Sequence, residues 1–254
     1  MIKNYSSAFL GFCILSLLLS CAKEGPTGPT GPVGPSYTGT LEGHVFLYDK
    51  YGSPVLSGYN RAGLTITGSS ISGTTAIPDS VTGLYIYQNI KTGTYAITAT
   101  DSGYASTRIN NVNFVSGTLY RDIKLSAIPD SFVTRFAAQQ SGITAYDSLV
   151  IHVIPNSRDR NCIVFVNNSS LVSNSTSYYL LHYVVRVPAN ATIVTLMIPD
   201  QDLTNAGLVS SKMAYYAIYS YVINDASVYE DVTSGKNVYN AVNQIPLIDS
   251  ALVP

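Results

Sequence analysis

The chain has 254 residues, of which 46% are hydrophobic, and its formal net charge is −1. This hydrophobic fraction is enough for a sizeable core and excludes general disorder. Charged residues make up 11%, so the sequence offers no basic patch for nucleic acid and no acidic field for cations. Its 20 tyrosines and many Ser, Thr and Asn residues favour strands and turns. The composition therefore predicts an all-β fold.

The N-terminus carries the pattern of a secretion signal. Lys3 precedes the apolar run Ala8–Leu19, which is too short to cross a bilayer as a stable helix but suits the core of a signal peptide. The run ends in Leu18-Leu19-Ser20-Cys21, which resembles the bacterial lipobox, in which the cysteine is acylated and becomes the mature N-terminus. The alternative is an ordinary signal peptide with a cysteine in its cleavage region. We predict a lipoprotein signal peptide over residues 1–20 and lipidation of Cys21.

The residues after Cys21 indicate where the chain is held. Ala22 stands where lipoproteins of the inner membrane often carry Asp, so it favours the outer membrane of a Gram-negative cell. Lys23-Glu24 resembles the charged export signal of some surface lipoproteins. We expect the chain to be anchored in the bacterial outer membrane through Cys21 and exposed at the cell surface.

A spacer with a strict Gly-Pro-X period follows, from Gly25 to Pro35. A collagen triple helix needs Gly at every third position, and the segment resembles the collagen-like leaders of some bacterial surface lipoproteins. Because the repeat is so short, a single-chain polyproline II stalk that rises about 3.1 Å per residue is favoured over a triple helix. We expect residues 21–36 to lift the folded part off the membrane.

Residues 37–128 alternate apolar and polar positions, which predicts short strands. The alternation is clearest in Gly43–Tyr48, Leu64–Thr67, Tyr85–Tyr87, Tyr95–Ala99 and Leu119–Leu125. Turn residues separate these segments, and no helical period is present, so we predict a β-sandwich. Gly93 is expected to take a positive φ in a hairpin turn over Lys91–Thr94, and Tyr95 is expected to begin an inward-facing alternation.

This region contains the pattern Gly43-x-Val45…Asp49…Gly52-x-Pro54, followed by Gly83-x-Tyr85…Asn89-Ile90…Gly93-Thr94-Tyr95…Gly103-Tyr104. The pattern resembles the carboxypeptidase regulatory-like domain. The resemblance implies a transthyretin-like, seven-stranded sandwich, also classed with carbohydrate-binding-like folds, and brings no catalytic residues. A related group of surface sandwiches forms Lys–Asn isopeptide bonds from an early core strand, but the strand predicted over Gly43–Tyr48 contains no lysine. We therefore exclude that cross-link.

Residues 129–254 predict a second sandwich, which begins after the strand-breaking Pro129. Its predicted strands are Phe132–Ala138, Leu149–Ile154, Cys162–Val166, Tyr178–Val187, Ile193–Ile198, Met213–Ile223 and Asn237–Val242. In Tyr178–Val187 the odd positions are apolar or aromatic, so His182 and Arg186 are expected to face solvent. The spacing suits an immunoglobulin-like fold. The segment from Tyr229 to Tyr239 resembles the last hairpin of a fibronectin type III domain.

Candidate catalytic and metal-binding residues are few. His44, His152 and His182 lie on separate predicted strands, and none has a cysteine or carboxylate at metal-ligand spacing. His152 and Cys162 could form a nucleophile pair across strands, but a cysteine that opens an apolar strand more often packs in the core, which we favour. Cys162 is the one cysteine left after signal cleavage and lipidation, so no internal disulfide is expected. We predict no catalytic residues, no metal and no cofactor.

One further group carries oxygen ligands. Asp200, Asp202 and Asn205 suit calcium, but the Gly and the terminal Glu of a calcium loop are missing. We expect these residues to form a solvated turn.

Tyrosine is the residue type best suited to binding, because its ring stacks on sugars while its hydroxyl hydrogen-bonds. Tyr215, Tyr216, Tyr219 and Tyr221 put aromatic rings on both faces of one predicted strand. Core packing with cross-strand pairs is favoured over a stacking platform for sugars, although the platform stays open.

Three triplets resemble the Asp-Ser/Thr-apolar acceptor sequence for O-glycosylation in some Gram-negative bacteria. They are Asp79-Ser80-Val81, Asp147-Ser148-Leu149 and Asp249-Ser250-Ala251. Ser80, Ser148 and Ser250 are accordingly the candidate acceptors.

Together these patterns predict two tandem β-sandwich domains, 37–128 and 129–254, on a lipid-anchored stalk. We expect a binding or adhesion module without enzymatic activity, with a polysaccharide or a surface protein as ligand. The alternative is a structural pilus-like or envelope-scaffold subunit. Some bacterial pilins also mature from lipoprotein precursors, but they are usually cleaved at an Arg, and none occurs between Cys21 and Tyr59. An enzyme is the third candidate, and loss of a hydrolytic activity in a Cys162→Ala variant would support it.

Overall fold

A computed structural model describes residues 37–56, 63–68, 75–140, 146–209, 212–223, 228–243 and 245–253. They lie in the compact unit Ser36–Pro254. The predicted signal peptide, Cys21 and the Gly-Pro-X spacer fall outside the described residues. The described part of the chain contains no helix with the length and apolar character that a membrane crossing requires.

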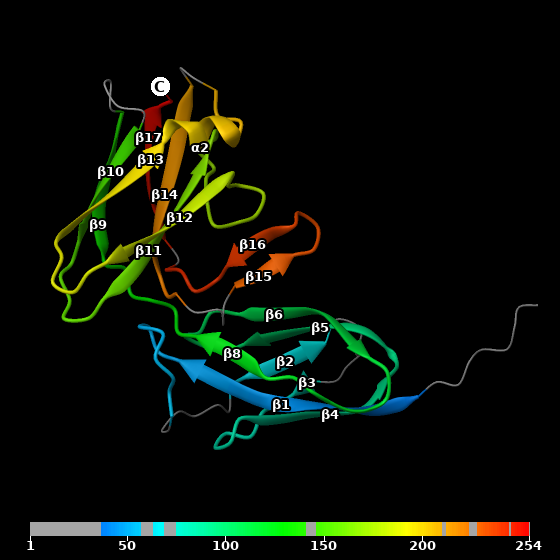
Figure 1. Ribbon diagram of the computed structural model, residues 1–254. Helices are drawn as coiled ribbons and strands as arrows, with labels where there is room; N and C mark the ends of the chain where they lie inside the picture. Colours follow the sequence, from blue (N-terminus) through cyan, green and yellow to red (C-terminus); the bar gives the residue numbers. More distant parts are fainter. Residues whose placement is uncertain are drawn as a thin grey trace, which may run out of the picture. The chain divides into compact units, whose positions relative to one another are not determined.

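The predicted all-β fold class is confirmed, since the described residues form strands and one short helix (Figure 1). The first strands are β1 (Thr38–Tyr48), β2 (Thr65–Gly68), β3 (Thr75–Ala76), β4 (Leu84–Lys91), β5 (Gly93–Thr100), β6 (Thr107–Phe114), β7 (Gly117–Tyr120) and β8 (Ile123–Ser126). The elements after them are β9 (Val133–Gln140), β10 (Tyr146–Val153), β11 (Arg160–Asn167), β12 (Leu181–Val187), β13 (Ile193–Pro199), α2 (Asp200–Asn205), β14 (Met213–Tyr221), β15 (Val228–Asp231), β16 (Lys236–Tyr239) and β17 (Leu247–Leu252).

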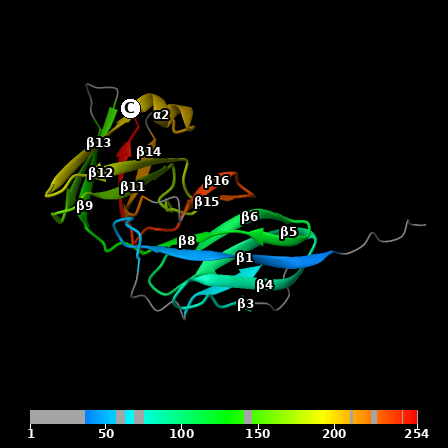
Figure 2. The ribbon, with the colours of Figure 1, turned by 60° about the horizontal axis from the view of Figure 1, so that its bottom comes forward.

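Strands β1 to β8 form the first sandwich. One sheet has the order β4-β1-β7, with β8 also paired to β1, and the other has the order β3-β2-β5-β6. Figure 2 shows β1 between β4 and β8. Alternate side chains from both sheets, such as Tyr85, Tyr87, Ile97 and Leu125, fill the space between them and are almost fully buried. The alternation that predicted these strands therefore marks the core-facing positions.

The backbone of β1 changes its parallel partner near Gly43. The first half of β1 pairs with β7 and the second half pairs with β8. Arg121, between β7 and β8, passes so close that a Cβ atom on Gly43 would lie 1.9 Å from the Arg121 carbonyl oxygen. The Arg121 N–H also donates to the Glu42 carbonyl at 2.8 Å. Only glycine fits at position 43, where the Arg121 backbone passes over β1. The single strand predicted over Leu119–Leu125 is divided at this point into β7 and β8.

The hairpin predicted over Lys91–Thr94 is wrong. Strand β4 pairs with β1, whereas β5 pairs with β2 and β6, so the chain crosses from one sheet to the other at this turn. The φ of Gly93 is not positive, and the left-handed conformation occurs at Asn89, with a φ of 58°. Asparagine tolerates that region better than most residues. The inward-facing alternation predicted from Tyr95 is confirmed, because Tyr95, Ile97 and Ala99 are buried.

The second sandwich contains the sheets β13-β10-β9 and β12-β11-β14-β17, with the two-stranded sheet β15-β16 beside them. The predicted β15–β16 hairpin is present, but it is not the last element, because β17 follows and pairs with β14. In the described residues, strands before Pro129 pair among themselves and strands after it do likewise. The domain limits 37–128 and 129–254 stay predictions.

The central strands β11 and β14 of the β12-β11-β14-β17 sheet are covered on both faces. On one face, side chains such as Val164 and Tyr216 pack against the β13-β10-β9 sheet. On the other face, Phe165 and Tyr219 pack in a separate core with Tyr239 of β16. Residues Cys162–Val166 of β11 therefore form a continuous apolar run, and every residue from Cys162 to Asn167 is buried.

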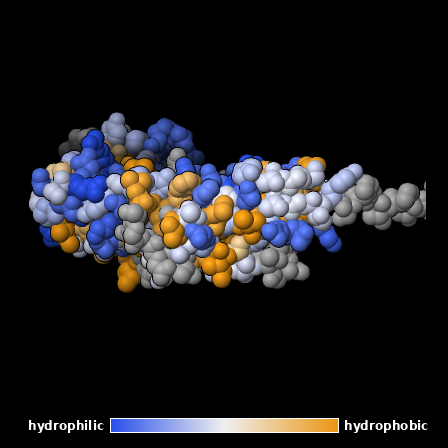
Figure 3. Space-filling view, turned by 90° about the horizontal axis from the view of Figure 1, so that it is seen from below, coloured by the Kyte–Doolittle hydropathy of each residue, from blue (hydrophilic) through white to orange (hydrophobic). Residues whose placement is uncertain are grey.

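The outer face of the β4-β1-β7 sheet carries apolar side chains between hydrophilic ones. Phe46 and Ile86 are each 43% exposed, and Phe46 is the register partner of the exposed Lys124. Figure 3, a view of the molecule from below, shows apolar and hydrophilic surface interspersed. Scattered apolar residues of this kind are ordinary on a protein surface.

Replacing Gly43 with alanine is expected to destabilise the protein by about 1–3 kcal/mol, because the new methyl group must displace the Arg121 backbone. The matched control is Gly93→Ala, whose Cβ would meet the Tyr95 ring at 3.6 Å, an ordinary contact. Urea unfolding of both variants measures the difference. Equal stability of the two variants would contradict the crossing described here.

Candidate functional site

Two hollows of about 370 and 410 Å³ share Asn174 and Asn240 in their walls. We call them together the amide groove. The first hollow is lined by Thr100, Tyr104, Ala105, Ser106, Ile128, Asn174, Tyr219, Asn240, Val242 and Asn243. The second is lined by Arg108, Asn174, Ser175, Thr176, Tyr229, Asp231, Val238 and Asn240. Volumes of this size are typical of sites for small organic ligands.

Hydrogen bonds fix the asparagine side chains of the amide groove. Asn240 Nδ2 donates to the carbonyl oxygen of Ser106 at 2.8 Å, and Asn174 Nδ2 donates to the carbonyl oxygen of Tyr239 at 3.1 Å. Asn243 Oδ1 accepts from the Ser220 N–H at 2.6 Å. The amides therefore tie together β14, the loop between β11 and β12, and the segments after β5 and β16.

The β15–β16 hairpin forms one wall of the groove and lies beside β6 (Figure 1). Asn110 Nδ2 of β6 donates to the Glu230 carbonyl oxygen of β15 at 2.9 Å. Lys236 Nζ of β16 donates to the Tyr179 carbonyl oxygen at 2.6 Å, and Tyr179 in turn donates through its hydroxyl to the Asn237 carbonyl oxygen at 2.6 Å. These bonds hold the hairpin in one position.

An aromatic cluster around Phe165 packs against Tyr219 in the groove wall. The ring centroid of Phe165 lies 5.1 Å from that of Tyr179, 5.7 Å from that of Tyr219 and 5.8 Å from that of Tyr239. His182 joins the cluster, since its Nε2 lies 2.6 Å from the Tyr239 hydroxyl oxygen. Edge-to-face and tilted ring contacts of this kind stabilise a fixed arrangement. Tyr219 belongs to both the cluster and the groove wall.

The groove is nearly free of formal charge. The first hollow is lined by amide, hydroxyl and apolar groups alone, and the second adds Arg108 and Asp231. Hydrogen bonds from Ser234 and Thr233 hold the pKa of the Asp231 carboxyl below its usual range. The arrangement suits an uncharged ligand that both donates and accepts hydrogen bonds.

The sequence predicts tyrosines as the binding residues, whereas no motif indicates the asparagines that line the groove. Of the four tyrosines on β14, Tyr216 packs in the core towards β10, while Tyr219 and Tyr221 pack in the core around Phe165. Tyr215 is partly buried. The favoured interpretation of core packing is confirmed for the buried three, and Tyr219 alone among them reaches the amide groove.

The three histidines do not converge. His44 is exposed and its Nδ1 lies 3.9 Å from Asp122 Oδ1, whereas the His152 Nε2 lies 3.2 Å from Arg135 Nη2. The prediction that His182 faces solvent is wrong, because the aromatic cluster covers it and burial lowers its pKa. Tyr239 of the β15–β16 hairpin covers this face of β12 at His182, whereas Arg186 on the same face is exposed, as predicted.

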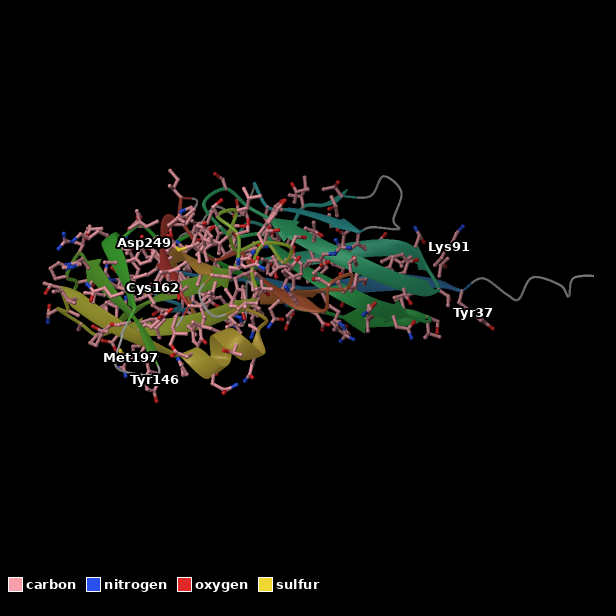
Figure 4. All side chains as sticks on the ribbon, turned by 90° about the horizontal axis from the view of Figure 1, so that it is seen from above. Tyr37, Lys91, Tyr146, Cys162, Met197 and Asp249 are labelled. Carbon is pink, nitrogen blue, oxygen red and sulfur yellow. The ribbon has the colours of Figure 1, made fainter. Side chains whose placement is uncertain are left out.

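Cys162 lies inside the second sandwich (Figure 4) and is completely buried. Burial raises the pKa of its thiol to about 12. The predicted packing role is confirmed, and the weighed alternative of a His152–Cys162 pair is contradicted, since β10 turns its Leu149, Ile151 and Val153 side chains inward and His152 away from that core.

Native protein is expected to leave Cys162 unmodified by iodoacetamide at pH 8, because the thiol is both buried and protonated. Mass spectrometry of the folded and the urea-unfolded chain measures the modification, and the unfolded chain serves as the control. Rapid labelling of the folded protein at Cys162 would contradict the buried position.

The solvated turn predicted at Asp200, Asp202 and Asn205 is instead the short helix α2, which buries Leu203. Asp202 Oδ2 accepts from the Tyr183 hydroxyl at 3.0 Å. The described residues contain no group of three or more His, Cys, Asp or Glu side chains that could hold a metal ion. The helix was missed because six residues are too few for a helical period.

A buried carboxyl group lies near this helix. Asp147 is fully buried and its Oδ2 accepts from the Tyr216 hydroxyl at 2.6 Å. Within the described part of the chain, Asp147 Oδ1 and Asp200 Oδ1 are buried atoms without a hydrogen-bond partner. Burial is the main cause that raises the pKa of Asp147, and the nearby Asp200 charge also raises it. The ionised form of Asp147 therefore destabilises the folded state relative to the protonated form.

Asp147→Asn is expected to become increasingly more stable than the wild type as pH rises above about 4, the usual pKa of an unfolded Asp. A raised folded-state pKa means that native Asp147 keeps its proton to a higher pH than unfolded Asp147 does. The stability that Asp147 contributes to the wild type is therefore present at low pH and is lost as pH rises through the folded pKa, whereas the Asp147→Asn variant has no group that titrates at this position. Urea unfolding of both proteins across pH 3–8 measures it. A stability difference that does not change with pH would contradict the assignment.

The candidate glycosylation serines differ in accessibility. Ser80 lies on an exposed turn, where Asp79 Oδ1 accepts from the N–H groups of Val81 and Thr82 at 3.0 and 2.6 Å. Ser148 on β10 and Ser250 on β17 are half-buried within strands. Ser148 lies opposite Met197, and Figure 4 shows Met197 and Tyr146 near each other at that end of the sheet. Modification at the three serines stays a prediction.

No family model and no curated protein matches the chain. Among solved structures, it is similar to a candidate carbohydrate-binding protein from Bacteroides uniformis, with 19% identity over 83% of this chain and 100% of that one and a TM-score of 0.29. A DUF3823 family protein from Parabacteroides merdae shows 12% identity over 73% and 90% of the two chains, with a TM-score of 0.27. The major pilin SpaD from Corynebacterium diphtheriae shows 12% identity over 80% and 63%, with a TM-score of 0.25. All three TM-scores lie below 0.5, so these similarities carry no inference about function.

Proposed function

We propose that this chain is a surface-exposed binding module that holds a neutral oligosaccharide in the amide groove. The uncharged lining of the first hollow is the observation that carries this proposal. Sugars present hydroxyl groups that donate and accept hydrogen bonds, and their C–H faces pack on aromatic rings. The groove offers both kinds of partner from elements that are already fixed.

The asparagine and tyrosine side chains have separate roles in this proposal. Asn174 and Asn240 lie where the two hollows meet, so they contact a ligand that spans both. Tyr104 and Tyr229 line opposite hollows and are partly exposed, which leaves ring surface for a sugar face. A ligand longer than one sugar unit would engage both hollows.

The N-terminal part of the proposal rests on the sequence. A lipid on Cys21 would hold the chain in the outer membrane, and the Gly-Pro-X spacer would carry the folded unit away from the lipid surface. A binding module on such a stalk can reach a polymer outside the cell. Labelling with radioactive palmitate tests the anchor, with Cys21→Ser as the unlabelled control.

A screen of neutral and acidic glycans against the full chain is expected to find a neutral oligosaccharide ligand. Asn174→Ala and Tyr229→Ala are each expected to weaken its binding about two- to tenfold, the usual net value of one hydrogen bond or one ring contact. Isothermal titration calorimetry measures the dissociation constants.

Matched controls for this test are Asn113→Ala and Tyr37→Ala, which alter exposed residues outside the groove. Both are expected to bind as the wild type does. Binding that survives the groove substitutions would refute the proposed site. Absence of any glycan ligand, together with concentration-dependent polymers in light scattering, would favour a structural subunit instead.

A further inference from the structure

Strand β13 is an end strand with one unpaired edge. It lies next to β10 in the β13-β10-β9 sheet, and no other strand of the described residues pairs with it (Figure 1). Its sequence, Ile193–Pro199, contains no charged residue, and its one proline is the last residue of the strand. Charges and internal prolines are the features that usually keep an open edge from pairing with another strand. Strand β13 has neither.

The other long end strands differ from β13 in this respect. Each of them carries at least one charged residue, and these include Lys91 of β4, Arg108 of β6, Arg135 of β9, Arg186 of β12 and Asp249 of β17. Strand β6 also lies beside β15, and β17 lies beside β9. Among the described strands of six or more residues at a sheet end, β13 alone carries no charge.

The backbone groups on the open edge of β13 follow from its register with β10. Val153 N–H donates to the Thr192 carbonyl oxygen at 2.9 Å, and the antiparallel register continues along β13 without a shift. In such a pair every second residue bonds to the neighbouring strand. The even-numbered residues of β13 therefore bond to β10, whereas the N–H and C=O groups of Ile193, Thr195 and Met197 point away from it.

The side chains of the same three residues lie on the outer face of the sheet. Ile193 and Met197 are 52% and 48% exposed, and Thr195 between them is also exposed. Val194 and Leu196 lie on the opposite face and are partly buried against the core. The order of residue types from Ile193 to Met197 is therefore apolar, apolar, threonine, apolar, apolar, which is the same in both directions.

This symmetry makes the edge complementary to a second copy of itself. When two β13 strands pair antiparallel about a two-fold axis at Thr195, Thr195 lies opposite the partner's Thr195, and Ile193 lies opposite the partner's Met197. Each of these residue pairs exchanges two backbone hydrogen bonds, which satisfies the outward N–H and C=O groups of all three residues. Apolar and threonine cross-strand pairs are favourable, and no like charges meet, because the strand carries none.

We propose that the chain forms a two-fold symmetric dimer by antiparallel pairing of β13 with β13 of a second copy. The pairing joins the β13-β10-β9 sheets of the two copies into one continuous sheet. A two-fold contact uses the same surface on both copies and closes on itself, so it differs from the polymers expected of a structural subunit. The dimer is independent of the oligosaccharide proposal, since no residue of β13 lines the amide groove.

Disulfide cross-linking of the full chain tests the dimer. Thr195→Cys places two thiols opposite each other, because the Cα atoms of a hydrogen-bonded antiparallel pair lie about 5.5 Å apart, within the range of disulfide geometry. Oxidation with diamide, which takes up the two electrons and two protons of the thiols, is expected to give a species of twice the mass. The control Thr134→Cys, an exposed position on β9 at the other end of the same sheet, is expected to stay monomeric.

Two further cysteine variants test the register. Ile193→Cys and Met197→Cys are expected to cross-link when the two variants are mixed, and to give little disulfide when either is oxidised alone. Adding Thr195→Lys to both variants is expected to lower the mixed yield about fivefold or more, because like charges then lie directly opposite each other. Thr195→Lys in one variant with Thr195→Glu in the other is expected to restore it.

Equal disulfide yields from Thr195→Cys and Thr134→Cys would overturn the proposal. Cross-linking of Thr195→Cys to a different protein, without a species of twice the mass, would also overturn it, because an unrelated strand would then occupy the edge. Neither outcome depends on glycan binding, so failure of the oligosaccharide proposal and failure of the dimer are told apart.

Discussion

The central strand β11 of the β12-β11-β14-β17 sheet has no face open to solvent, and this constraint shapes the rest of the second sandwich. Strand β11 is buried along both faces from Cys162 to Asn167, so two layers of structure must cover it. One layer is the β13-β10-β9 sheet. The other is assembled from the β15–β16 hairpin and the loop between β11 and β12, with Ala105 and Ile128 contributed from before Pro129. An isolated two-stranded hairpin is only marginally stable. The aromatic core around Phe165 therefore stabilises the β15–β16 hairpin, and the hairpin in turn buries this face of β11.

The amide groove is a consequence of this cover. Irregular segments expose backbone carbonyl groups that need hydrogen-bond donors, and the short side chains of Asn174 and Asn240 donate to two of them. The same asparagines line the hollows. A structural requirement therefore places polar, uncharged groups around a concave surface, with Tyr219 fixed beneath it by Phe165. The chemistry proposed for the groove follows from how the sheet is covered.

Period-two alternation was sufficient to predict most strands and their buried faces, as at Tyr95, Ile97 and Ala99. It failed where pairing depends on parts of the chain far apart in sequence. The Lys91–Thr94 turn has the residues of a hairpin but joins two sheets, and His182 has a solvent-facing position but is covered by Tyr239. The groove could not be predicted, because Tyr104, Asn174 and Asn240 are remote from one another along the chain and no local motif links them. Cys162 could be placed in the core because the run Cys162–Val166 is apolar throughout.

A crystal structure of the chain with a glycan ligand bound would show whether the cover of this sheet forms a site for a neutral oligosaccharide. We expect electron density for the sugar in the amide groove, with hydroxyl groups within hydrogen-bond distance of Asn174 or Asn240. Density on the outer face of the β4-β1-β7 sheet, with the groove empty, would contradict it.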